Sequence, residues 1–116
     1  MDIKKKIEEI LARDYDHEIP DKLRSRDFNK AINAWLRKSF PGCAMYPTKG
    51  AWCEASGFIE KDGKYVFYSF QDYRYWDWKE QILIRTAKSE KDYTGGANHY
   101  TNIDRMVDDV NALFDR

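Results

Sequence analysis

The chain has 116 residues, which suits one folded domain and is too short for two, and no composition change divides it. Hydrophobic residues at 42% and charged residues at 34% exclude an intrinsically disordered chain. Twenty basic and twenty acidic residues cancel, which excludes a uniformly basic nucleic-acid coat and an acidic nucleic-acid mimic. We therefore expect a single domain, residues 1–116, whose electrostatic interactions are local.

The N-terminal third predicts two helices. The first runs from Asp2 to about Arg13, because its apolar residues repeat with helical spacing. Its charged residues interrupt any signal-peptide core, and no run in the chain is long enough to span a membrane, so we expect a cytoplasmic protein. The second helix begins at about Asp21 or Ser25 and ends at Ser39, before Pro41-Gly42. The residues expected on the buried sides are Ile3, Ile7, Ile10, Leu11, Phe28, Ala31, Ile32, Trp35 and Leu36.

Four strands are predicted next in the chain. Pro47 marks the first as an edge strand, and Gly57 predicts a bulge in the second. Asp62-Gly63 predicts a tight hairpin turn before the third strand, because Gly tolerates the positive φ that such a turn requires. The expected strands are Cys43–Tyr46, Ala51–Glu60, Tyr65–Phe70 and Glu80–Ala87.

The last part of the chain predicts a loop and a helix. Residues from Lys88 to Tyr100 are polar and lack a periodic pattern, so we expect a mobile surface loop. A clean apolar stripe follows, and Thr101, three residues before Asp104, indicates a capping arrangement. The stripe consists of Ile103, Met106, Val107, Val110, Leu113 and Phe114. The element order α-α-β-β-β-β-α predicts an α+β fold, an antiparallel four-stranded meander with helices packed on one face.

Aromatic residues make up 16% of the chain and gather between Tyr65 and Trp78. Apolar side chains occur on both faces of this segment, so its outer side is either covered by other elements or offered to a partner. We expect Tyr65, Val66, Phe67 and Phe70 to belong to the core. The second half mixes Tyr, Trp and Arg, which is the composition of a binding hot spot. Its predicted partner-binding residues are Tyr73, Arg74, Tyr75, Trp76 and Trp78.

A second candidate surface lies on the predicted second helix. Lys22, Arg26, Lys30 and Arg37 fall on one side at 3.6 residues per turn. From Lys22 to Lys49 the chain has seven basic residues and a single acidic one. The row is either a solvated helix face or a docking surface for a phosphate backbone or an acidic protein patch.

Catalytic and metal-binding patterns are weak, so we expect no enzyme activity, no cofactor and no metal. The acidic residues around His17, from Asp14 to Asp21, lack the Gly turn and final Glu of a calcium loop. Cys43 and Cys53 are either free thiols or one disulfide, and no signature supports pairing either with His99 in a thiol enzyme. Thr94-Gly95-Gly96 does not have the ending of a phosphate-binding loop.

Two short segments carry a resemblance. Gln81-Ile82-Leu83-Ile84-Arg85-Thr86-Ala87 and Asp92-Tyr93-Thr94-Gly95-Gly96-Ala97-Asn98 resemble passages in small accessory proteins of phages and conjugative elements, some of which are anti-CRISPR inhibitors. The resemblance implies a host protein or ribonucleoprotein target. Our leading hypothesis is a non-enzymatic binding protein that occupies a surface of a larger protein or ribonucleoprotein, an inhibitor of a host defence system such as a CRISPR effector. The alternative is a nucleic-acid-binding module that uses the basic side of the second helix.

Overall fold

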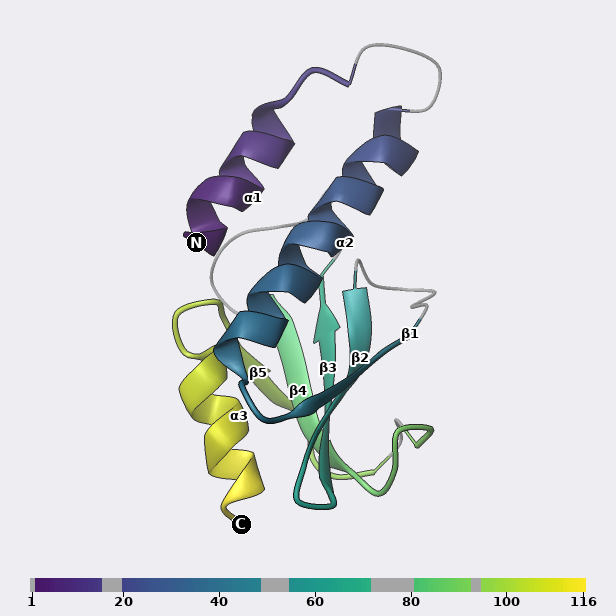
Figure 1. Ribbon diagram of the computed structural model, residues 1–116, viewed down its shortest axis with the longest axis vertical. Coiled ribbons are helices and arrows are strands. Elements are labelled where there is room, and N and C mark those ends of the chain that lie inside the picture. Colours follow the sequence, from purple (N-terminus) through teal and green to yellow (C-terminus); the bar gives the residue numbers. More distant parts are fainter. Residues whose placement is uncertain (1, 16–19, 49–54, 72–80, 93–94) are drawn as a thin grey trace.

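A computed structural model describes residues 2–15, 20–48, 55–71, 81–92 and 95–116, and within these the backbone alone at positions 20 and 21 (Figure 1). The chain begins with α1 (Ile3–Ala12) and α2 (Pro20–Ser39). The strands β1 (Ala44–Thr48), β2 (Ala55–Lys61), β3 (Lys64–Phe70), β4 (Ile82–Ala87) and β5 (His99–Thr101) follow, and α3 (Met106–Phe114) ends the fold. The molecule is elongated, with extents of 46 × 26 × 24 Å.

The five strands form one antiparallel sheet in the order β1-β2-β3-β4-β5. The α+β class and the antiparallel meander are confirmed, but the predicted four strands are wrong. β5 begins inside the predicted loop, extends one residue beyond it to Thr101, and pairs His99 with Ile84 and Tyr100 with Leu83. Three residues are too short to show a period of two, so this strand is defined by its partner and not by its own pattern.

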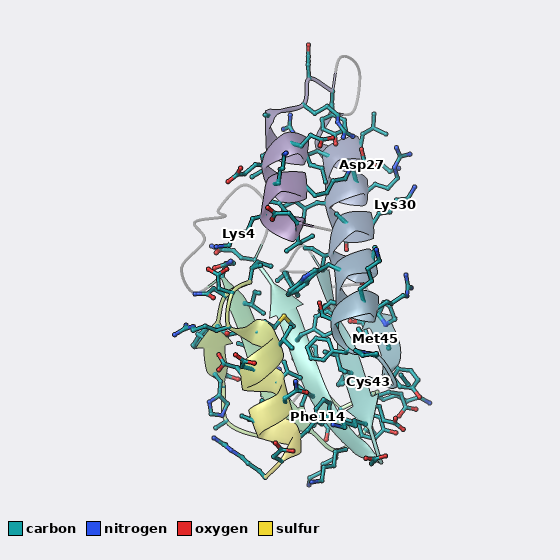
Figure 2. All side chains as sticks on the ribbon, turned by 60° about the vertical axis from the view of Figure 1, so that its left-hand side comes forward. Lys4, Asp27, Lys30, Cys43, Met45 and Phe114 are labelled. Atoms are coloured by element: carbon teal, nitrogen blue, oxygen red, sulfur yellow. The ribbon has the colours of Figure 1, made fainter. Side chains whose placement is uncertain are left out.

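All three helices contribute to one core on one face of the sheet. The register aligns Ile59 with Val66, Tyr68 with Ile84 and Phe70 with Ile82, so these side chains share a face. They belong to the same buried cluster as the apolar stripes of the helices. Figures 1 and 2 show α2 and α3 lying across this face, and α1 packed on α2. The helical members of the cluster are Ile3, Ile7, Ile10, Phe28, Ala31, Ile32, Leu36, Met106, Val110, Leu113 and Phe114.

The opposite face of the sheet carries a second set of rings. Phe58 is 1% exposed yet lies outside the main core cluster, and its ring centroid is 5.2 Å from that of Phe67. The Arg85 guanidinium lies over the Phe67 ring at 4.9 Å, and Tyr46 contacts Tyr65 at 6.3 Å. The prediction that Val66 and Phe70 are core residues is confirmed, whereas Tyr65 and Phe67 face away from the helices and are half-buried.

The turns explain how the meander is held in register. Asp62 and Gly63 both have positive φ, 53° and 80°, which is the two-residue hairpin turn expected from the sequence. The predicted bulge at Gly57 is wrong, because β1, β2 and β3 pair one to one through this position. Gly57 is needed for close packing instead. A Cβ there would lie 2.6 Å from the Tyr46 carbonyl oxygen and 2.6 Å from the Tyr68 hydroxyl.

The helix ends differ in how closely they follow prediction. Asp2 caps α1 by accepting a hydrogen bond from the Lys5 backbone N–H at 3.2 Å. The predicted capping role of Thr101 is wrong. This residue belongs to β5, and its hydroxyl donates to the Asp109 carboxylate at 2.6 Å. At the other end of α3, the Lys64 ammonium donates to the Phe114 carbonyl at 2.7 Å, where a cation favours the helix dipole.

Candidate interaction surface

The helical hairpin α1–α2 extends beyond the sheet. Figure 1 shows α1 and the first half of α2 above the ends of the strands, whereas the second half of α2 crosses the sheet. α1 contributes Ile3, Ile7 and Ile10 to the contact between the helices. The first half of α2 therefore presents a broad outer side that no described strand covers.

A polar cluster fastens the end of α1 to α2. Arg13 contacts Glu9 at 2.9 Å and Asp27 at 3.1 Å through its two terminal nitrogens. The Tyr15 hydroxyl donates to the same Asp27 carboxylate at 2.8 Å. Arg24 lies over the Tyr15 ring at 5.0 Å and donates to the Arg13 carbonyl at 3.1 Å. Asp27 is thus engaged by residues outside its own helix.

Protonation in this cluster follows from these contacts. The hydrogen bond from Tyr15, together with Arg26 and Arg13 nearby, lowers the pKa of Asp27 below its ordinary value. Burial raises the pKa of Tyr15, and the adjacent Asp27 carboxylate raises it further. At neutral pH the pair is therefore an ionised carboxylate and a neutral phenol. Asp27 holds the segment that follows α1 against α2 through its contacts with Arg13 and Tyr15.

The predicted basic residues Lys22, Arg26, Lys30 and Arg37 lie on one exposed side of α2, hereafter the basic face. The Arg26 Nε atom lies 3.5 Å from a carboxylate oxygen of Asp27, as an ion pair. The other three make no ion pair with any residue that the structure describes, and Figure 2 shows Lys30 directed away from the helix. Asp27 is the only acidic side chain described on α2, and Arg13 and Tyr15 engage it. Among the described residues, Lys22, Lys30 and Arg37 therefore have no counter-ion, and Arg26 shares Asp27 with Arg13 and Tyr15.

A groove of about 300 Å³ lies beside the basic face, between α1 and α2. We call it the α1–α2 groove. It is hollow because small residues occupy the α2 side where larger ones would fill the gap between the helices. Its lining residues are Lys6 and Ile10 of α1, Arg13 at the C-cap of α1, and Asp27, Lys30, Ala31 and Ala34 of α2.

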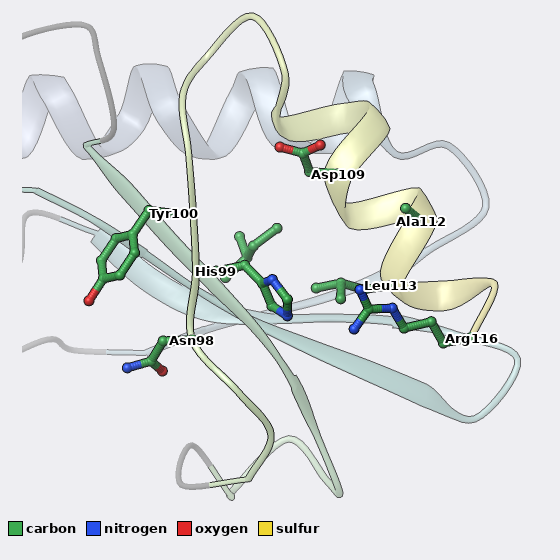
Figure 3. Close-up of a pocket in the computed structure, with 8 residues that line it drawn as sticks. Asn98, His99, Tyr100, Asp109, Ala112, Leu113 and Arg116 are labelled. Atoms are coloured by element: carbon green, nitrogen blue, oxygen red, sulfur yellow. The ribbon is translucent and has the colours of Figure 1, made fainter.

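A second hollow, of about 440 Å³, lies between β5 and α3. Figure 3 shows the His99 ring and the Arg116 guanidinium directed into the same space beside Leu113. Asp109 also lines the hollow, but its carboxylate accepts the hydrogen bond from Thr101. No hydrogen bond between His99 and Asp109 is present among the described contacts, so this hollow does not contain an oriented acid–base pair.

The structure does not bring Cys43 and His99 together. Cys43 precedes β1 at one edge of the sheet and is a free thiol, whereas His99 begins β5 at the other edge. Four strand spacings separate the edges by about 19 Å, far beyond hydrogen-bond reach. Burial also raises the pKa of the Cys43 thiol, which disfavours the reactive thiolate. Cys53 lies outside the described residues.

Several predicted site residues cannot be compared with the structure. Tyr73, Arg74, Tyr75, Trp76 and Trp78 lie outside the described residues, so the aromatic hot spot stays a prediction. Of the acidic patch around His17, Asp14 is described and exposed. Within the described ranges, no three His, Cys, Asp or Glu side chains gather as a metal site would require.

The sequence interpretation missed the part that α1 plays in the surface. Lys6, Ile10 and Arg13 follow a spacing of four and three residues, as do Asp27, Ala31 and Ala34 on α2. The sequence signal for the groove is the pair of small residues, Ala31 and Ala34, on the α2 stripe, facing the charged residues Lys6 and Arg13 on the α1 stripe. This signal appears only when the two helices are placed side by side, because the pattern of a single helix does not contain it. Lys38, also exposed and without a described ion pair, extends the positive region.

In the part of the chain that the structure describes, no helix is both long and apolar enough to span a membrane. No protein-family model matches this chain, and no curated protein and no solved structure is significantly similar to it.

Proposed function

We propose that this protein is a non-enzymatic binding protein that docks through the basic face of α2 onto an acidic surface of a larger protein or ribonucleoprotein. The observation that carries the proposal is the engagement of Asp27 by Arg13 and Tyr15, which leaves Lys22, Lys30 and Arg37 without a described counter-ion. Exposed cations of this kind set the rate and orientation of an encounter. Neutralising or truncating these side chains should therefore change the rate of association with the partner more than the stability of the fold.

The neighbouring groove favours a protein surface over a bare phosphate backbone. Its lining includes the apolar side chains of Ile10, Ala31 and Ala34, for which a phosphate backbone has no complement. The whole chain is also neutral, with a pI near 6.7, whereas dedicated nucleic-acid-binding domains are strongly basic. A host defence ribonucleoprotein such as a CRISPR effector is the partner that the sequence resemblance favours, and the proposed effect is inhibition by occupying its surface.

The test compares two variants with four neutralised cations each. The first replaces Lys22, Arg26, Lys30 and Arg37 by Gln, and the matched control replaces the exposed Lys5, Lys61, Lys88 and Lys91 by Gln. Immobilised wild type and both variants are incubated with lysate of the native cells, with and without nuclease, and the retained proteins are identified by mass spectrometry. We expect a protein partner retained by wild type and control and lost by the α2 variant. Equal retention by all three would contradict the proposal.

Direct nucleic-acid binding is the second candidate, because Lys22 to Arg37 places four cations along about 22 Å of helix. Four neutralised phosphates predict a slope of log K against log salt of roughly −3.6 on duplex DNA. Fluorescence anisotropy with a labelled duplex and a labelled single-stranded RNA measures this slope. Binding that has this slope and disappears in the α2 variant would favour the second candidate over the first.

A further inference from the structure

The lining of the α1–α2 groove combines an apolar floor with a cationic rim. Ile10 is fully buried and Ala31 is 6% exposed, so they form the floor, and the half-buried Ala34 forms one wall. Lys6, Arg13 and Lys30 line this floor together with one carboxylate, that of Asp27, and Glu9 outside the lining contacts Lys6 and Arg13. Such a groove suits an apolar side chain whose neighbours are negatively charged.

The charges of the rim are not equivalent. Arg13 is balanced by Glu9 and Asp27, whereas Lys6 has only a long contact to Glu9 at 3.7 Å. Lys30 makes no ion pair with a described residue and belongs to both the groove and the basic face. The cations available to a ligand therefore lie at Lys30 and Lys6, on opposite walls of the same groove.

The length of the groove limits what it can hold. Lys6 to Arg13 and Asp27 to Ala34 each cover eight residues, whose seven helical steps span about 10 Å. This length fits one apolar side chain with the acidic residues that flank it, and it does not fit a long hydrophobic helix. Burial of the apolar group would supply affinity, and the carboxylates would supply orientation.

We infer that the α1–α2 groove receives one apolar side chain from an acidic segment of the protein partner, flanked by carboxylates that contact Lys6 and Lys30. The inference rests on the proposed function and names the chemistry of the partner surface. The cations at Lys6 and Lys30 favour an acidic peptide as the ligand. The apolar floor favours a peptide that also carries an apolar side chain over a polyanion that has none.

The experiment uses labelled 13-residue peptides of Glu and Asp with a single central residue, measured by fluorescence anisotropy against the full chain. We expect the peptide with central Phe to bind at least about tenfold more tightly than the peptide with central Gly, because one ring becomes buried. Ala34→Leu fills the groove and leaves every cation, so it should remove this difference. The matched control is Ala112→Leu, an exposed alanine of α3, which should keep the difference.

Amide chemical shifts of the wild type give a second readout that does not depend on a variant. On titration with the Phe peptide, the changes should concentrate between Lys6 and Arg13 and between Asp27 and Ala34. Absence of peptide binding, equal binding of the Phe and Gly peptides, full binding to Ala34→Leu, or shifts confined to other elements would each overturn the inference. A dimer of wild type that Ala34→Leu disrupts would assign the groove to a second copy of the chain and also overturn it.

The groove and the basic face can fail separately. Lys22, Arg26 and Arg37 lie outside the groove lining, so replacing these three by Gln leaves the groove intact. If lysate capture is lost in that variant but unaffected by Ala34→Leu, the proposed function holds and the groove inference is wrong. If neither variant changes capture, both are wrong.

Discussion

Replacement of Gly57 by Ala should destabilise the sheet at the point where three strands meet. The added Cβ would lie 2.6 Å from the Tyr46 carbonyl oxygen, 2.6 Å from the Tyr68 hydroxyl and 2.9 Å from the Pro47 Cα. Two of these atoms belong to the backbone of β1, so no side-chain rotation can remove the overlap. Either β1 shifts away from β2 or the strain remains in the folded state.

Two opposing effects determine the size of the change. Overpacking of this kind costs about 1–3 kcal/mol. Replacing Gly by Ala also reduces the entropy of the unfolded chain, which returns about 0.4–1 kcal/mol. We therefore expect the free energy of unfolding to fall by about 1–2 kcal/mol, and for 116 residues this lowers Tm by roughly 4–8 °C.

Urea denaturation followed by circular dichroism measures this difference. Gly95→Ala is the matched control, because a Cβ at Gly95 meets its nearest atoms at 3.7 and 3.9 Å, which is ordinary contact. Tyr68→Phe removes the hydroxyl and leaves the Tyr46 carbonyl in place, so the cost of Gly57→Ala should persist in that background. A Gly57→Ala protein as stable as the wild type would refute the reasoning.

Three further predictions concern the polar cluster, the core and the thiol. Because the pKa of Asp27 is lowered in the folded state, its contribution to stability should be complete above about pH 4 and be lost as the pH falls through the lowered value. Asp27→Asn should reduce the pH dependence of the free energy of unfolding below about pH 4, by less than about 1 kcal/mol. The same pH dependence in variant and wild type would contradict this. Ile32→Ala, at a fully buried position, should cost about 2–5 kcal/mol in urea denaturation, whereas Ala112→Gly on the exposed side of α3 should cost about 1 kcal/mol. Burial raises the pKa of Cys43, so iodoacetamide at pH 7.5 should modify it more slowly than a free cysteine peptide, as measured by peptide mass mapping, and equal rates would contradict its burial.

The elements that could be predicted are those whose pattern is local. The apolar stripe of α3 and the Asp62-Gly63 turn depend on residues close in the chain, and both are confirmed. β5 could not be predicted, because its three residues acquire their conformation by pairing with β4 across a long loop. The role of Gly57 was predicted wrongly for a related reason: the Tyr46 carbonyl and the Tyr68 hydroxyl, which come from the two neighbouring strands, occupy the space that a Cβ would take.

The same distinction applies to the candidate surface: its local pattern could be predicted, and its contacts between distant segments could not. Helical spacing alone aligned Lys22, Arg26, Lys30 and Arg37, and all four are exposed on one side of α2. The state of Asp27 could not be predicted, because its partners Arg13 and Tyr15 come from another part of the chain. Without those partners, the carboxylate would partly neutralise the row. The groove likewise requires the relative placement of two helices, which no single-helix pattern contains.

The neutral total charge conceals an uneven distribution. α3 (Met106–Phe114) has Asp108 and Asp109 in its first turn, with Arg105 before it and Lys64 at its C-terminal end, whereas the exposed side of α2 is basic. Figure 1 shows α3 at the opposite end of the long axis from the first half of α2. If the partner has the acidic surface proposed above, the basic face attracts that surface, which orients the approach before contact. Because this steering depends on exposed charges, added salt should slow association with the partner and leave dissociation from the α1–α2 groove nearly constant.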